Sequence, residues 1–125
     1  MLRFVVCIHV AGSESGPAGP LTVRFDDVLA ELEKLPRLFI EPDGSFVWRG
    51  SADGQDWQVE GNLIDRGERL DYVEIKGCCP TEGLDDILRT LGWPLAALAF
   101  QLPRQGVFLT EEEFRRQAAT PPGAE

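Results

Sequence analysis

The sequence predicts one α+β domain: a mainly antiparallel sheet of five or six strands, with two principal helices on one face and a short C-terminal helix. Three observations lead to this expectation. Apolar residues alternate strictly near the start of the chain, strand-like runs joined by short turns fill its middle, and two other segments repeat apolar residues at helical spacing. Because strands joined by short turns pair antiparallel, we expect a central four-strand meander from about Leu38 to Gly77.

Length and composition agree with a single domain. The chain has 125 residues, of which 43% are hydrophobic and 26% charged, an ordinary balance for a protein with one buried core. We expect the domain to span residues 1–117. The segment 11–20, rich in glycine, proline and serine, is expected to form a flexible loop, and residues 118–125 a disordered tail.

The first strand and the first helix are predicted from two different spacings of apolar residues along the chain. From Leu2 to Val10 every second residue is apolar, which is typical of a strand with one buried side. Apolar residues then recur at helical spacing from Phe25 to Leu35, and Pro36 cannot continue a helix. We therefore expect a helix from about Asp26 to Leu35, with its acidic first turn at the positive end of the helix dipole.

The adjacent cysteines Cys78 and Cys79 fall where the last meander strand gives way to a second helix. We expect Gly77 to end that strand and Thr81 to cap the helix. The pattern of leucine and isoleucine that follows is amphipathic, and Gly92 with the next proline predicts where the helix ends. We therefore interpret Cys78 and Cys79 first of all as part of the connection between a strand and a helix, without a chemical role.

The C-terminal part predicts one more strand through Gln101, a turn, a short extended piece and a last helix. Thr110 and Glu113 have the spacing of a capping box, in which each side chain bonds the other's backbone N–H group. Leu109 and Phe114 have the spacing of a hydrophobic staple around it.

The charge of the chain restricts its partners. Twelve basic and twenty-one acidic residues leave a net charge of −9, which repels nucleic acid and favours a basic protein partner, if it has one. No apolar run approaches the length of a membrane span. Three cysteines, an odd number without regular spacing, do not form a disulfide framework, so we expect reduced thiols and a cytoplasmic protein.

Cysteine and histidine offer two chemical alternatives. Cys7 and His9 share one side of the first strand, and with Cys78 and Cys79 they make four soft ligands of the kind that zinc prefers. Neither pair has the usual spacing of a zinc site, so ordinary thiols and a histidine bonded to a sheet neighbour are the preferred interpretation, with no cofactor expected. The other alternative is a thiol-dependent enzyme, because Cys78 and Cys79 lie near the start of a helix.

The polar side of the sheet is the candidate binding surface. Alternation places polar and charged residues of several strands on one face, and a mixture of both charge signs with tyrosine and histidine is typical of a recognition surface. The residues predicted to bind are His9, Arg49, Glu60, Asn62, Tyr72, Glu74 and Lys76. The leading hypothesis is a non-enzymatic module that binds a protein through this face. A small-molecule or zinc-binding domain and a thiol enzyme are the alternatives.

Overall fold

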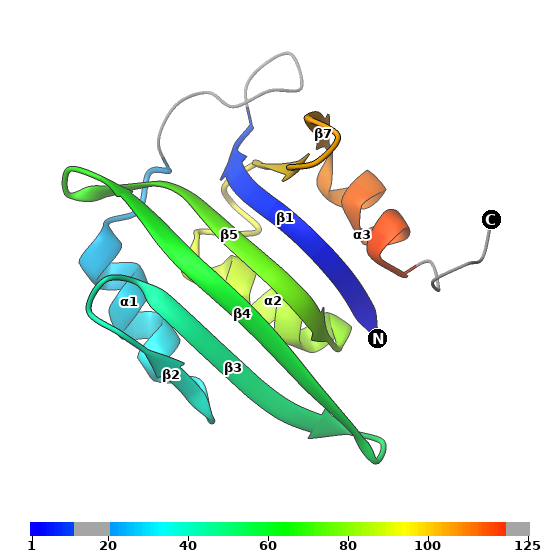
Figure 1. Ribbon diagram of the computed structural model, residues 1–125. Coiled ribbons are helices and arrows are strands. Elements are labelled where there is room, and N and C mark those ends of the chain that lie inside the picture. The colour runs from blue at the N-terminus through cyan, green and yellow to red at the C-terminus, as the bar shows by residue number, and fades with distance from the viewer. Residues whose placement is uncertain (12–20, 120–125) are drawn as a thin grey trace.

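The structure is a computed structural model that describes residues 1–11 and 21–119 (Figure 1). Within them, one antiparallel sheet has the strand order β2-β3-β4-β5-β1-β6-β7. Its strands are β1 (Leu2–Val10), β2 (Leu38–Ile40), β3 (Ser45–Ala52), β4 (Gln55–Arg66), β5 (Arg69–Cys79), β6 (Leu98–Leu102) and β7 (Val107–Leu109). The helices are α1 (Phe25–Glu33), α2 (Thr81–Thr90) and α3 (Glu111–Ala119).

The α+β class and the four-strand meander are confirmed. The sheet has seven strands and not five or six, because the short piece β7 pairs with β6 through three residue pairs after the turn at Gly106. β1 lies between β5 and β6, and each of these is antiparallel to it. The order β6-β1-β5-β4 is the strand order of a ferredoxin-like arrangement. In this protein β3 and β2 extend that sheet beyond β4.

One face of the sheet forms the hydrophobic core. Leu2, Phe4, Val6 and Ile8 of β1 are buried on this face, as their alternation predicts. All three helices contribute to the same buried cluster, through residues such as Val28 of α1, Leu84 and Ile87 of α2, and Phe114 and Ala118 of α3. The helices therefore cover one face of the sheet, and the other face is left open by the described part of the chain (Figure 1).

Aromatic contacts hold α3 in place. The Phe114 ring stacks on Phe100 of β6 at 4.6 Å between centroids, and it also meets Phe4 of β1 at 6.1 Å. Trp93 Nε1 donates a 2.6 Å hydrogen bond to Glu111 Oε1 at the start of α3. The C-terminal helix thus packs against the sheet and is hydrogen-bonded to the segment after α2.

Several predicted boundaries need correction. β5 continues to Cys79, so Gly77 does not end it, and Gly77 instead takes a φ of 131° inside the strand. Pro80 occupies the N-cap position of α2, without a side-chain cap, and Thr81 is the first helical residue. A proline in extended conformation before the helix explains the difference, since its fixed φ suits that position.

The ends of two further segments also differ from expectation. α1 covers Phe25–Glu33 and so ends two residues before the predicted Leu35, because the 3₁₀-like bond of Lys34 N–H to Glu31 O closes it. α3 runs through Ala119, so residues 118 and 119 of the predicted tail are helical, and Ala118 is buried in the core. Of the predicted loop 11–20, Ala11 N–H donates to Ala97 O, and residues 12–20 lie outside the described residues, as do residues 120–125 of the predicted tail.

The capping box of α3 is confirmed. Thr110 N–H donates to Glu113 Oε1 at 2.9 Å, and Glu113 N–H donates to Thr110 Oγ1 at 3.2 Å. The Thr110 N–H bond lowers the pKa of the Glu113 carboxyl from its ordinary value of 4.5. Of the helices in the described chain, the longest has ten residues, far short of the roughly 20 that would cross a bilayer.

Candidate functional site

All seven residues predicted to bind lie on the open face, the side of the sheet away from the helices. The strand register puts them in cross-strand rows. Asn62 of β4 pairs with Glu74 of β5, and Glu74 pairs with Cys7 of β1. One row further along, Glu60 pairs with Lys76, and Lys76 pairs with Val5. Period-two alternation, applied to four separate strands, therefore placed these side chains on one surface.

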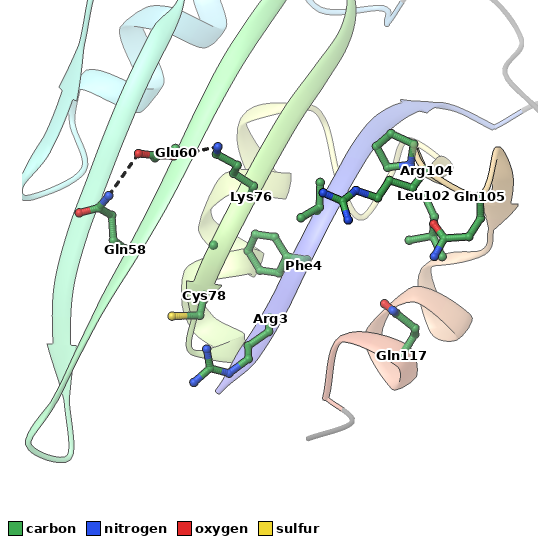
Figure 2. Close-up of a pocket in the computed structure, with 13 residues that line it drawn as sticks. Arg3, Phe4, Gln58, Glu60, Lys76, Cys78, Leu102, Arg104, Gln105 and Gln117 are labelled. Carbon is green, nitrogen blue, oxygen red and sulfur yellow. Dashed lines mark hydrogen bonds and ion pairs between the residues drawn. The ribbon is translucent and has the colours of Figure 1, made fainter. Parts of the chain in front are cut away.

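A chain of polar contacts crosses three strands of the open face. Arg49 Nε donates to Gln58 Oε1 at 3.0 Å, and Gln58 Nε2 donates to Glu60 Oε1 at 3.4 Å. Lys76 Nζ then lies 3.5 Å from Glu60 Oε2. Figure 2 shows the last two contacts as dashed lines. All these contacts are solvent-exposed, so they stabilise the fold little and remain available for exchange with a partner.

His9 stands in an aromatic cluster at one end of the open face. Its ring stacks on Tyr72 at 5.1 Å and meets the edge of Phe108, from β7, at 5.6 Å. Nε2 of His9 lies 3.0 Å from Gln101 Oε1, and it donates this hydrogen bond because an amide oxygen only accepts. The predicted histidine bonded to a sheet neighbour is therefore what the structure contains.

Burial and charge affect two groups near this cluster. Partial desolvation, followed by the nearby carboxylate of Glu74, raises the pKa of Tyr72 from its ordinary value of 10.0. The same two causes, in the same order, raise the pKa of the Cys7 thiol, which is only 8% exposed although it faces the open side. Both groups therefore stay protonated at neutral pH.

Two adjoining hollows, of about 650 Å³ and 480 Å³, lie on the open face and share Val5, Glu60, Lys76 and Pro103. We call the two together the trough. Predicted residues line it: Glu60 and Lys76 lie in both hollows, and Asn62 and Glu74 in the smaller one. Arg49 lines a third hollow of about 620 Å³ beside it. His9 and Tyr72 line none of the three.

The wall of the trough was not predicted from the sequence. The turn between β6 and β7 contributes Pro103, Arg104 and Gln105, and β1 contributes Arg3 and Val5. Figure 2 labels three of these side chains, Arg3, Arg104 and Gln105. Pro103 and Gly106 signalled a turn in the sequence, but no pattern within that turn indicates which face of a distant strand it will border.

The four candidate zinc ligands do not converge. Cys79 is fully buried on the helix-covered face, whereas Cys7, His9 and Cys78 lie on the open face. Cys78 pairs with Arg3, four residues from Cys7 along β1, which separates the two by about 13 Å at the usual rise of a strand. Within residues 1–11 and 21–119, no group of three or more histidine, cysteine or acidic side chains could hold a metal ion.

The buried thiol of Cys79 is also unsuited to nucleophilic chemistry. Desolvation, with a smaller contribution from the neighbouring Cys78, raises the pKa of Cys79 from 9.0 to about 12. The thiolate is the nucleophile, so a thiol that keeps its proton at neutral pH does not react readily. Adjacent cysteines of a strand point to opposite faces, and only Cys78 reaches the open one.

Most of the net negative charge of the protein lies in its three helices. The three helices contain ten acidic and three basic residues, a net charge of −7 out of the −9 of the whole chain. The larger hollow of the trough is lined by three basic side chains, Arg3, Lys76 and Arg104, and one acidic side chain, Glu60. The larger hollow therefore does not share the negative charge of the helices.

Neither a protein-family model, nor a curated protein, nor a solved structure matches this chain. What the site can do must be argued from its own geometry.

Proposed function

We propose that this protein is a small, non-enzymatic protein-interaction module that binds its partner through the open face of the sheet. The observation that carries this proposal is the trough, which lies on the open face, is bordered by one helical residue, Gln117 of α3, and is surrounded by polar side chains of both charge signs. A mixed polar and apolar surface of this kind is suited to protein recognition, in which a few buried contacts are framed by a polar rim.

The contents of the trough support binding more than catalysis. Its only cysteine thiols are those of Cys7, which burial keeps protonated, and Cys78, which has no histidine near it in the strand register. The single histidine of the chain lies outside the trough and is bonded to Gln101. Nothing in this arrangement resembles a nucleophile held beside a base, which a thiol enzyme requires.

The chemistry of the partner is a separate question. The net charge of −9 favours a basic partner, and this expectation applies best to the helix-covered side, because the three helices hold −7 of that net charge. We also propose a cytoplasmic location, because the three cysteines are free and reduced thiols are typical of that compartment.

A capture experiment with matched variants tests the proposal. The protein is immobilised, and proteins retained from an extract of the source organism at moderate salt are identified for the wild type, Glu60→Lys, Glu74→Lys and Glu33→Lys. Glu33 is an exposed acidic residue of α1, on the other side of the molecule, so its variant has the same charge change without touching the open face.

The expected result is a partner that Glu33→Lys retains to the same extent as the wild type and that both open-face variants retain to a different extent, because only they alter the charge of the open face. A partner retained equally by all four proteins would overturn the proposal, because its binding would not involve the open face. Circular dichroism of each variant checks that the fold is intact, and elemental analysis of the same sample tests the zinc alternative.

A further inference from the structure

β1 is paired along only half of one edge. Towards β6 its sheet partners begin at Cys7, which pairs with Gln101, and extend to Val10, which pairs with Leu98. Within the described residues, no strand pairs with the segment from Leu2 to Val6 on that side, and Figure 2 shows this half of β1 with α3 and the β6–β7 turn around it. β6 is too short to reach it, since Pro103 follows directly after Leu102 and a turn begins.

The direction of the unpaired backbone groups follows from the neighbouring pairs. Ala11 N–H donates to Ala97 O at 2.9 Å, on the β6 side of the strand. N–H and C=O groups of a strand point to the same side at every second residue. In the register of β1 and β6, this side belongs to Ala11, His9 and Cys7, and by continuation to Val5 and Arg3. Val5 and Arg3 thus direct their N–H and C=O groups to the edge where the sheet is unpaired.

The same two residues line the larger hollow of the trough. Val5 is 56% exposed, so an apolar side chain stands beside a row of backbone donors and acceptors. Arg3 and Arg104 extend into this hollow from two sides, and neither has an ion-pair or hydrogen-bond partner within the described chain. A free sheet edge with unpaired cations beside it is complementary to an extended and acidic chain.

We propose that an extended acidic segment of a partner protein adds as a strand to the Leu2–Val6 half of β1, with its carboxylates facing Arg3 and Arg104. This inference rests on the proposed function, since it names the partner chemistry of the open face. In strand addition, main-chain hydrogen bonds to the edge provide affinity and alternate side chains provide specificity.

The test uses synthetic hexapeptides that carry a fluorescent label. The probe alternates glutamate and valine, and the matched control alternates lysine and valine. Two more versions of the probe are N-methylated, one at all glutamates and one at all valines. Because every second N–H of an added strand points to β1, methylation of one set should abolish binding, and methylation of the other should leave most of it. Fluorescence anisotropy measures all four affinities.

Protein variants and amide exchange complete the test. Arg104→Glu should weaken binding of the glutamate probe about fivefold or more, on the scale of an exposed charge pair reversed. Arg66→Glu, at the end of β4 and outside the trough, is the matched control and should bind like the wild type. Hydrogen exchange at the amides of Arg3 and Val5 should slow when the probe binds, because these N–H groups become paired.

The outcomes separate this inference from the proposed function. If the glutamate probe binds no better than the lysine control, or binds without slowing exchange at Arg3 and Val5, strand addition to β1 is overturned. Capture of a partner that changes in Glu60→Lys and Glu74→Lys but not in Glu33→Lys would still support the open face as the interaction surface. If probe binding and open-face-dependent capture both fail, both proposals fall together.

Discussion

The two faces of the sheet are made by alternate residues of the same strands, but they obey different physical constraints. The helix-covered face is a continuous apolar cluster that includes Phe4, Phe100 and Phe114, and it determines the stability of the fold. The open face carries exposed ion pairs such as Lys76–Glu60 and an unpaired stretch of β1. The helix-covered face thus provides stability and the open face is proposed to bind a partner. Substitutions on the first should change the free energy of unfolding, and substitutions on the second should change binding.

The largest effect is expected from Phe114→Ala. Phe114 is fully buried, stacks on Phe100 and contacts Phe4, so its truncation leaves a cavity between α3 and the sheet. We expect the free energy of unfolding to fall by about 3–5 kcal/mol in urea denaturation. Val5→Ala, on the open face, should change it by about 0.5 kcal/mol or less. A loss below about 1 kcal/mol for Phe114→Ala would show that α3 does not belong to the cooperative core.

The adjacent thiols give the sharpest comparison of the two faces. Because the pKa of Cys79 is about 12 and its ordinary value is 9.0, its alkylation by iodoacetamide at pH 8 should be about a thousandfold slower in the folded protein than after unfolding. Cys78, half-buried on the open face, should react well before it. Mass spectrometry of the digested protein measures both rates. Rapid modification of Cys79 would contradict its place in the core.

The same thiol predicts how stability depends on alkaline pH. Since burial raises the pKa of Cys79, the folded state favours the protonated thiol. Its stabilisation is fully present below the ordinary value of 9.0 and is lost as the pH rises through about 12. A Cys79→Ala variant should therefore show a shallower loss of stability than the wild type above pH 9, in unfolding experiments over that range.

A smaller effect is expected at the cap of α3. Thr110→Ala removes the hydroxyl that accepts the N–H of Glu113, and this should lower the free energy of unfolding by about 1 kcal/mol. The lowered pKa of Glu113 means that its contribution is present above the ordinary value of 4.5 and is lost as the pH falls through the folded value. Thr110→Ser, which keeps the hydroxyl, is the control and should retain most of the stability.

The smallest effect is expected on the open face itself. Lys76→Ala breaks the pair with Glu60, whose side chains are 64% and 47% exposed, so the free energy of unfolding should change by about 0.5 kcal/mol or less. Thermal and urea unfolding measure this change. A loss comparable to that of Phe114→Ala would mean that the open face also contributes to the stability of the fold, and the contrast between the two faces would not hold.

Local patterns in the sequence were sufficient for most of the elements. The alternation from Leu2 to Val10, the turn residues of the meander and the capping box at Thr110 each depend on residues close together in the chain, so each could be predicted. The boundary at Cys79 could not, because a glycine with positive φ inside β5 looks like a strand end when only the sequence is read. The pairing of β7 depends on β6 and on the turn between them, and three residues carry little periodic signal.

By itself the sequence determined which residues share a face, because the period of a strand is a property of the backbone and needs no knowledge of neighbouring strands. It therefore identified the open face and its polar residues, including Glu60, Glu74 and Lys76. Only the tertiary structure decided which strands are neighbours, where β6 stops beside β1, and that Arg3 and Arg104 border one hollow. Those features depend on contacts between residues about a hundred positions apart, and no local pattern encodes the distance between them.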